Sequence, residues 1–374
     1  MELTDLRKEI DTIDSEIVRL FKERLKISRA VAEYKIENGR KVFDKAREDE
    51  KIRTLTAYGE DKFEKRALEE FFRQIMAVSR KIQYRIMTER GNIARTAFIP
   101  VDELYDGDVR VVFQGAEGAY SQAAMNKYFK GNIKSGHVDT FRDAMVAIEE
   151  GSADFAVLPI ENSTAGIVGD IFDLLVEFEN YIVGEQIMKI EHCLLGVKGS
   201  SLNDVKRVYS HPQSLMQSQK FISDMGYEQI SMQNNAFAAR KVSEDNDKSK
   251  AAIASEYAAG IYGLDVLKKG VNMNKDNSTR FIVVTNRKIF MKNAGKISIC
   301  FELPHESGSL YRILSHFIYN DLNMTKIESR PIAERSFEYR FFVDFEGNLE
   351  DSAVKNALRG LRDEAKNLKV LGNY

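Results

Sequence analysis

Residues 3–36 of the chain read LTDLRKEIDTIDSEIVRLFKERLKISRAVAEYKI, in which apolar residues recur at alternating spacings of three and four. This period is typical of one amphipathic α-helix, roughly 50 Å long at ~1.5 Å per residue. Only about sixty further residues precede the first proline, Pro100, which is too few to cover such a helix along its whole length. We therefore expect its apolar stripe to pack against the same helix of a second chain in an intertwined homodimer, with further assembly into a tetramer left open.

One charged residue interrupts this stripe. Arg24 takes the place of an apolar residue between Leu20 and Ile27, and burying an unpaired guanidinium costs several kcal/mol. We therefore expect an anionic group to meet Arg24. Lys35 lies about three turns further on, rotated by about 20°, so both side chains can line one face. Arg7 lies roughly 25 Å up the helix on another face, where it could serve only the site of a partner chain.

Two later helical segments also carry polar residues at helical spacing. Asp44, Arg47 and Glu48 fall at positions i, i+3 and i+4, and Ser79 interrupts an apolar stripe with Gln83 one turn later. Taken singly, these residues favour solvated salt bridges or a serine bonded to its own backbone. Taken together, three helices that each direct polar residues towards one interior indicate a binding site.

The N-terminal segment, residues 1–92, resembles the all-helical chorismate mutases. Eight residues match the active-site set of that family in order and spacing: Arg7, Arg24, Lys35, Asp44, Arg47, Glu48, Ser79 and Gln83. Chorismate is a dicarboxylate that rearranges to prephenate in one pericyclic step, which needs no nucleophile, acid, base or cofactor. Such a site has only to hold a compact conformer and stabilise the charge that develops in the transition state.

The resemblance implies catalytic roles for four of these residues. Arg24 would clamp a carboxylate of the substrate, Lys35 and Gln83 would stabilise negative charge on the ether oxygen, and Glu48 would hold the ring hydroxyl. The other four would bind the substrate, with Arg7 supplied by the partner subunit.

From residue 109 the pattern changes to short β-rich runs that alternate with helical ones. This alternation predicts an α/β domain with a substantially parallel sheet over residues 109–286. Polar, glycine-containing segments follow several of these strands, where ligands of open α/β sheets bind. The sequence contains no GxGxxG, Walker A, HExxH or nucleophile-elbow motif, and its five histidines do not cluster. Nucleotide, zinc and catalytic-triad chemistries therefore lack support, and we expect neither a cofactor nor a metal.

Four segments of this domain resemble signature stretches of the prephenate dehydratases in the same order: GAYS at 118–121, PIENSTAG at 159–166, SHPQ at 210–213 and NSTRF at 277–281. That family has two α/β lobes with the substrate between them. Prephenate loses carbon dioxide and its ring hydroxyl together, so a proton donor must help the hydroxyl to depart. The resemblance implies that Thr279 is this donor. Substrate binding would fall to six residues: Glu161, Asn162, Ser163, Ser210, Gln213 and Gln217.

The last segment, residues 296–374, shows the order strand, helix, strand, strand, helix, strand, which predicts an α+β ferredoxin-like fold. Residues 93–108, before the central domain, are typical of a linker. The last segment resembles ACT domains, small modules that bind amino acids. The resemblance implies feedback inhibition by phenylalanine at a regulatory site made by Gly308, Ser309, Leu310, Tyr311, Glu328, Ser329, Arg330 and Pro331. In isolation these residues also fit a helix cap and a turn.

The composition, with 43% hydrophobic and 30% charged residues and a formal net charge of -2, is that of an ordinary soluble globular protein. Lysine and arginine are scattered, and no apolar run approaches the ~18 residues that span a bilayer. We therefore expect neither nucleic acid nor membrane as a partner. Cys193 and Cys300 lie far apart in the sequence, without the spacing of a disulfide framework, which fits a reducing cytoplasm.

The resemblances together imply a bifunctional enzyme that converts chorismate to prephenate and prephenate to phenylpyruvate, the precursor of phenylalanine. Three alternatives remain open. The second domain could act on arogenate instead of prephenate. The chain could be a non-enzymatic protein that binds amino acids or dicarboxylates, or a structural helical dimer fused to a regulator.

Overall fold

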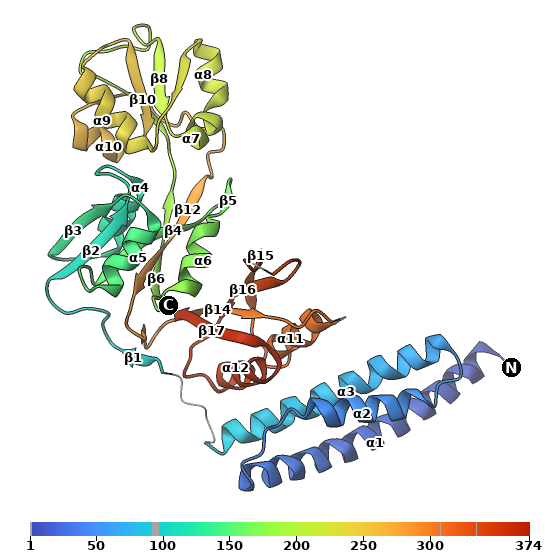
Figure 1. Cartoon of the computed structure of the whole chain (residues 1–374). Helices are drawn as coiled ribbons and strands as arrows, with labels where there is room; N and C mark the ends of the chain where they lie inside the picture. The colour runs from blue at the N-terminus through green and yellow to red at the C-terminus, as the bar shows by residue number, and fades with distance from the viewer. Residues whose placement is uncertain (1, 92–96, 307, 334) are drawn as a thin grey trace. The chain divides into compact units, whose positions relative to one another are not determined.

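The computed structural model describes residues 2–91, 97–306, 308–333 and 335–374 (Figure 1). These residues form two compact units. The first contains residues up to 97 together with 295–370, and the second contains residues 98–294 together with 371–374. Within the described ranges, no helix is both long and apolar enough to cross a membrane.

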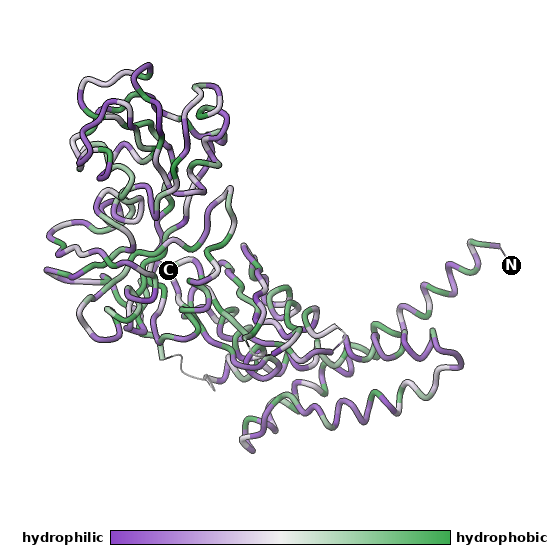
Figure 2. The backbone as a smooth tube through the Cα atoms, turned by 45° about the horizontal axis from the view of Figure 1, so that its top comes forward, coloured by the Kyte–Doolittle hydropathy of each residue, from purple (hydrophilic) through white to green (hydrophobic). Residues whose placement is uncertain are grey.

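The N-terminal part of the first unit is a bundle of three helices, along which hydrophobic and hydrophilic residues alternate (Figure 2). The helices are α1 (Leu3–Glu37), α2 (Lys45–Thr56) and α3 (Lys62–Glu89). The prediction of one helix from about residue 3 to 36 is confirmed. The carboxylates of Asp44 and Asp61 accept hydrogen bonds from the backbone N–H groups of Arg47 at 3.1 Å and Glu64 at 2.7 Å, and thereby cap α2 and α3.

The N-terminal half of α1 keeps its apolar stripe on the surface of the single chain. Leu3 is 63% exposed and Ile13 is 59% exposed. The C-terminal half of α1 lies against α3, where Ser28 and Ala32 are buried. The homodimer stays a prediction, and the uncovered stripe is the surface that it would bury.

The C-terminal part of the first unit has the predicted order of strands and helices. It consists of β14 (Lys296–Glu302), α11 (Ser309–Ile318), β15 (Met324–Pro331), β16 (Tyr339–Glu346), α12 (Ser352–Glu364) and β17 (Lys366–Asn373), of which residues 371–373 belong to the second unit. The strands lie in the order β15-β16-β14-β17, with β16 antiparallel to both β14 and β15. This is the strand arrangement of a ferredoxin-like sandwich. Its helix α12 packs against α11 and also against α3 of the bundle.

The second unit contains two lobes, each built on a sheet that carries helices (Figure 1). The first lobe has the strand order β6-β12-β4-β2-β3, and the second has β11-β7-β10-β8-β9. The elements of the first lobe are β2 (Val109–Gln114), α4 (Tyr120–Tyr128), β3 (Ile133–Val138), α5 (Phe141–Glu149), β4 (Phe155–Asn162), β5 (Gly166–Ile167), α6 (Gly169–Glu177), β6 (Tyr181–Lys189) and β12 (Ser278–Thr285). Those of the second are β7 (Cys193–Gly196), β8 (Arg207–Ser210), α7 (Pro212–Gln217), α8 (Gln219–Met225), β9 (Glu228–Ser231), α9 (Asn235–Asp245), β10 (Lys250–Ala254), α10 (Glu256–Tyr262) and β11 (Asp265–Lys268).

The prediction of substantially parallel sheets is wrong for part of each lobe. Strand β2 runs parallel to β3 and β4, and β8 runs parallel to β9 and β10. However, β12 is antiparallel to both β4 and β6, and β7 is antiparallel to β10 and β11. After the second lobe, the chain returns to the first lobe as β12, which therefore runs in the direction opposite to β4 and β6. An apolar run indicates a strand but carries no information about its direction.

The predicted linker, residues 93–108, is only partly a connection. Residues 93–96 lie outside the described residues. Strand β1 (Ile99–Val101) pairs in parallel with β13 (Ile289–Met291), and Leu104 is buried in the core of the first lobe. The second half of this segment is therefore folded onto the second unit.

Candidate active sites

Side chains from all three helices of the bundle enclose a cavity of about 340 Å³. It is lined by seven of the eight residues predicted for the mutase site: Arg24, Lys35, Asp44, Arg47, Glu48, Ser79 and Gln83. Arg7 lies further along α1 and does not line the cavity of its own chain.

Two cations of α1 are held by acceptors in the wall of this cavity. Arg24 donates to the carbonyl oxygen of Ile75 at 3.2 Å and to the hydroxyl of Ser79. Lys35 donates from Nζ to the carbonyl oxygen of Val42 at 2.7 Å. Burial lowers the pKa of both cations from their ordinary values, although acidic groups nearby oppose the shift. Because both cations retain further N–H donors, the cavity favours an anionic ligand.

The amide of Gln83 is only half satisfied. Its Nε2 donates to the carbonyl oxygen of Ser79 at 3.2 Å. Its Oε1 is buried and meets no hydrogen-bond partner within the described part of the single chain. A buried acceptor without a partner costs about 1–3 kcal/mol, so this position favours a donor from a ligand or from a second chain.

Sequence reasoning missed two charged residues of the cavity wall, Lys51 and Arg80, of which Arg80 is the more buried. Its side chain lines the cavity, yet the residue is only 5% exposed. Arg80 Nη1 lies 2.5 Å from Glu48 Oε2, so it binds the carboxylate that was expected to hold the ring hydroxyl. Arg80 lies on α3 between Ser79 and Gln83, two residues predicted for the site, and this position could have marked it as a candidate from the sequence.

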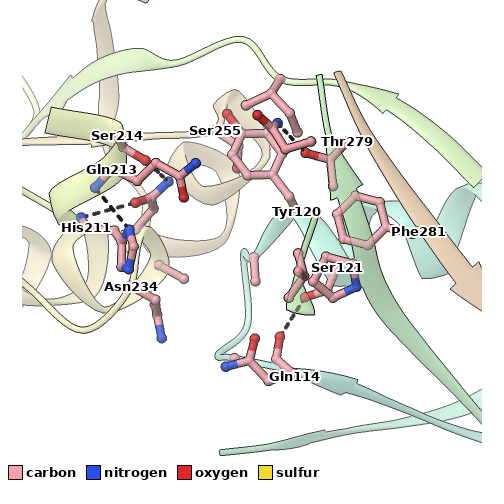
Figure 3. Close-up of a pocket in the computed structure, with 18 of the residues that line it drawn as sticks. Gln114, Tyr120, Ser121, His211, Gln213, Ser214, Asn234, Ser255, Thr279 and Phe281 are labelled. Atoms are coloured by element: carbon pink, nitrogen blue, oxygen red, sulfur yellow. Dashed lines mark hydrogen bonds between the residues drawn. The ribbon is translucent and has the colours of Figure 1, made fainter. Parts of the chain in front are cut away.

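A second cavity, of about 330 Å³, lies between the two lobes of the second unit (Figure 3). Four of the residues predicted for the dehydratase line it: Asn162, Gln213, Gln217 and Thr279. Tyr120, Ser121, His192 and Asn234 also line it, and sequence reasoning had given none of these a role.

Asn162 makes the Thr279 hydroxyl a hydrogen-bond acceptor on one side. Asn162 Oδ1 accepts from the backbone N–H groups of Thr164 at 3.0 Å and Ala165 at 2.9 Å, which sets the orientation of the amide. Asn162 Nδ2 therefore faces Thr279 Oγ1, to which it donates at 2.9 Å. Because Thr279 Oγ1 accepts this bond, its own proton remains free to be donated into the cavity.

A buried histidine holds a second amide of the cavity, that of Gln217. His192 is 2% exposed, its Nε2 lies 3.0 Å from Gln217 Oε1, and its Nδ1 lies 3.1 Å from the hydroxyl of Tyr120. Gln217 Oε1 also accepts from Asn277 Nδ2 at 3.2 Å. Burial lowers the pKa of His192 from its ordinary value, which favours the neutral ring. With both acceptor positions of Gln217 occupied, its N–H donors are left for a ligand.

Three other predicted residues do not line this cavity. Ser210 is completely buried, and its hydroxyl donates to the carbonyl oxygen of Ile253 at 2.6 Å. Ser163 Oγ accepts from the backbone N–H of Ser278 at 2.9 Å, which ties the loop after β4 to β12. Glu161 lies 3.7 Å from Arg280 on the neighbouring strand. These positions favour structural roles around the cavity over direct contact with a ligand.

The eight residues predicted for a phenylalanine site are not brought together in the single chain. Ser309 and Leu310 line one cavity of about 340 Å³. Gly308 and Tyr311 line another, of about 930 Å³, together with side chains of α3. The stretch from Glu328 to Pro331 lies on β15 and lines neither. Gly308 has φ +74°, a left-handed conformation that favours glycine at the start of α11.

Among the described residues, no three histidine, cysteine, aspartate or glutamate side chains cluster in a way that could hold a metal ion. Both cysteines are buried and free.

Comparison with known proteins assigns the helical bundle and the second unit to two known families. Residues 6–84 match the family model of Chorismate mutase type II, and residues 111–289 match that of Prephenate dehydratase. A bifunctional chorismate mutase/prephenate dehydratase of Aquifex aeolicus is 32% identical over 380 residues, which cover 100% of this chain and 98% of that protein. An arogenate dehydratase/prephenate dehydratase of Arabidopsis thaliana is 38% identical over 277 residues, which cover 71% of this chain and 72% of that protein.

Two solved structures resemble about 71% of the chain. The prephenate dehydratase of Arthrobacter aurescens in complex with L-Phe is 29% identical, has a TM-score of 0.65, and is matched over 89% of its length. A protein described as a quorum quenching acylase, GqqA, is 33% identical, has a TM-score of 0.66, and is matched over 97% of its length. Because the Aquifex relative matches along the whole of both chains and both family models are present, this chain is an enzyme with both activities and belongs to the family of bifunctional chorismate mutase/prephenate dehydratases.

Proposed function

We propose that chorismate rearranges in the cavity of the helical bundle and that prephenate becomes phenylpyruvate in the cavity between the two lobes. The observation that carries the first assignment is the meeting of seven predicted polar residues from three helices in one cavity. The second assignment rests on Thr279, whose hydroxyl accepts from Asn162 and faces the second cavity.

In the mutase cavity, fixed charges replace acid and base chemistry. Arg24 binds a carboxylate of chorismate. Lys35 Nζ and the second N–H of the Gln83 amide stabilise the negative charge that grows on the ether oxygen as its bond to the ring breaks. Glu48 accepts a hydrogen bond from the ring hydroxyl and so selects the compact conformer.

The mutase site is completed by a second chain in this proposal. Arg7 of the partner subunit supplies the second carboxylate clamp, and the exposed apolar stripe of α1 supplies the interface. Dilution tests this point. Mutase activity per chain should fall at concentrations where the dimer dissociates, whereas the dehydratase cavity, built from one chain, should keep its activity. A mutase rate that stays constant while sedimentation shows monomers would refute the shared site.

In the second cavity, Thr279 gives its proton to the departing ring hydroxyl. The bond between the ring and the carboxylate breaks, its electron pair enters the ring, the carbon–oxygen bond breaks, and carbon dioxide and water leave as the ring becomes aromatic. Threonine is a weak acid, and the N–H of Asn162 stabilises the negative charge that develops on Thr279 Oγ1. Gln213 and Gln217 orient the substrate from the other lobe.

The C-terminal part of the first unit acts as an ACT domain in this proposal, and phenylalanine bound to it lowers dehydratase activity. The ferredoxin-like strand order supports this role, and the Arthrobacter relative was solved with L-Phe. Because the predicted residues are dispersed in one chain, the site is expected to form between two copies. Equal dehydratase rates with and without saturating phenylalanine would refute the proposal.

A second candidate substrate is arogenate, which the name of the Arabidopsis relative includes. Side-by-side turnover of prephenate and arogenate by the purified chain separates the two possibilities. We place the enzyme in the cytoplasm because both cysteines are buried and free, as suits a reducing compartment.

One experiment tests both activities together. Purified protein is given chorismate in the presence of a chelator, and the loss of chorismate and the formation of phenylpyruvate are followed at the same time. Both signals should appear. Loss of chorismate without phenylpyruvate would overturn the assignment of the second cavity, and an unchanged chorismate concentration would overturn that of the first.

A further inference from the structure

Arg80 lies between a carboxylate of the mutase cavity and a carboxylate of the C-terminal part of the first unit. On one side, Arg80 Nη1 lies 2.5 Å from Glu48 Oε2 on α2. On the other side, Arg80 Nε and Nη2 lie 2.9 Å and 3.4 Å from the two carboxylate oxygens of Glu364, at the end of α12. The guanidinium plane is thus fixed by Glu364 through two nitrogen atoms, which sets the direction in which Nη1 points at Glu48.

Glu364 is itself held in place and ionised. His316 of α11, which is 2% exposed, lies with its Nε2 3.2 Å from Glu364 Oε1. The ring of His316 occupies the space over Gly360 on α12, where any Cβ would overlap it. Burial opposes ionisation of Glu364, but the contacts with His316 and Arg80 outweigh it and lower the pKa of Glu364 to about 2.

Two further polar contacts hold α3 against the C-terminal part. Lys81 Nζ donates to Ser315 Oγ at 2.8 Å, and the hydroxyl of Tyr84 donates to Asp363 at 3.0 Å. Together with Arg80 they give three contacts from buried residues within one turn of α3. The position of Glu364 relative to α3 is therefore well defined.

We propose that Arg80 is a positioning residue for the chorismate mutase reaction, and that Glu364 of the C-terminal part sets the position of Glu48 through it. The inference rests on the proposed role of Glu48 in holding the ring hydroxyl. Glu364 does not line the mutase cavity, so any effect of Glu364 on that reaction must pass through another residue. The C-terminal part thereby becomes a structural component of the mutase site in addition to its proposed regulatory role.

The test uses the full chain and the variant Glu364→Gln, which keeps the shape of the side chain and removes its charge. Without the paired carboxylate, Arg80 loses its fixed orientation and Glu48 its fixed position. We expect kcat/KM for chorismate to fall about tenfold. The fall should lie mostly in KM, because Glu48 binds the hydroxyl in the ground state and the transition state alike.

A double-mutant cycle distinguishes positioning from a general structural effect. If Glu364 acts through Glu48, the variant Glu48→Gln/Glu364→Gln should be no slower than Glu48→Gln alone. Additive losses would overturn the proposal. Arg80→Lys, which keeps the charge but cannot reach both carboxylates in a fork, should resemble Glu364→Gln. The matched control is Arg85→Gln on the same helix, since the Arg85 side chain is 74% exposed and pairs with Glu89 at the surface.

Dehydratase activity on prephenate, measured on the same samples, reports whether each variant is folded, and we expect it to be unchanged. If Glu48→Gln retains full mutase activity, the proposed role of Glu48 fails. If Glu48→Gln is impaired but Glu364→Gln equals the wild type, only the positioning role of Arg80 and Glu364 fails.

Discussion

Replacing Thr279 with valine removes one hydroxyl from the second cavity and keeps the shape of the side chain. Thr279 lies on β12 between β4 and β6, in register with Asn162 and Met188, and it is only 8% exposed. The backbone pairing on both sides does not involve the side chain, so the strand should stay in place. We expect kcat for the dehydratase reaction to fall about 10²–10⁴-fold, the contribution of a positioned proton donor.

The loss of stability should be much smaller than the loss of catalysis. Asn162 Nδ2 loses Thr279 as an acceptor but keeps Asn277 Oδ1 at 2.8 Å and the carbonyl oxygen of Ser278 at 3.2 Å. We therefore expect the free energy of unfolding to fall by about 1 kcal/mol. The expected fall in kcat corresponds to about 2.7–5.4 kcal/mol in the activation free energy, so the two effects can be separated.

The assay follows phenylpyruvate formation from prephenate, with the mutase rate of the same chain as an internal control for folding. Thr279→Ser keeps the hydroxyl and should retain activity within about tenfold of the wild type. A Thr279→Val variant that keeps more than about a tenth of kcat would refute the role of Thr279 as proton donor.

Three further changes test other parts of the structure. Gln83→Glu should make mutase activity acid-dependent, because a carboxylate donates to the ether oxygen only when it is protonated; the rate should fall at least about tenfold from pH 5 to pH 7.5 while the wild type changes little. His192→Gln keeps a donor beside the second cavity and should retain most dehydratase activity, whereas His192→Leu should lower kcat/KM about tenfold. Because burial lowers the pKa of His192 in the folded chain from 6.5, the free energy of unfolding of the wild type should fall relative to His192→Gln as the pH drops below 6.5. Gly360→Ala forces a Cβ into the ring of His316 and should cost about 1–3 kcal/mol of stability in denaturant unfolding, whereas Gly260→Ala, with open space around its Cβ, should be neutral or slightly stabilising.

Different results would contradict each of these expectations. A pH profile of Gln83→Glu equal to that of the wild type would remove Gln83 from the reaction. Equal activities of the leucine and glutamine variants at position 192 would show that the ring of His192 does not position Gln217. Equal unfolding midpoints for the two glycine variants would show that the His316 ring can move to accept a Cβ at position 360, so that α11 and α12 are not closely packed there.

The helical bundle was the part of the fold that the sequence predicted best. The spacing of three and four along residues 3–36 admits only a helix of that length, and the structure places it at Leu3–Glu37. The polar residues of its cavity were also recognisable, because a charged residue such as Arg24 at an apolar position must be buried and therefore needs an anionic partner. The partner of Arg80 was not predictable, since Glu364 lies 284 residues further along the chain and no local pattern connects them.

In the second unit, the sequence predicted strands and polar loops but not how they combine. Resemblance to a family brought Thr279, Asn162 and Gln217 into one list, and the structure places all three around one cavity. It could not distinguish a residue in the cavity wall from one behind it, so Ser210 was expected to bind the substrate although it is completely buried. His192 was missed because a lone histidine between two strands carries no signal until its two ring nitrogens are seen to meet Tyr120 and Gln217.

The two cavities differ in how much of the site one chain supplies. In the dehydratase cavity the amide oxygens of Asn162 and Gln217 each accept two hydrogen bonds, so their donors are already oriented before a ligand arrives. In the mutase cavity Gln83 Oε1 is buried without a partner in the described part of the chain, and Glu48 is held by Arg80, which depends on Glu364. The mutase site therefore draws on the C-terminal part of its own chain and, in our proposal, on a second chain. This dependence gives the helical bundle and the C-terminal part a reason to remain on one polypeptide, because Glu364 of the C-terminal part pairs with Arg80, a buried cation of the bundle.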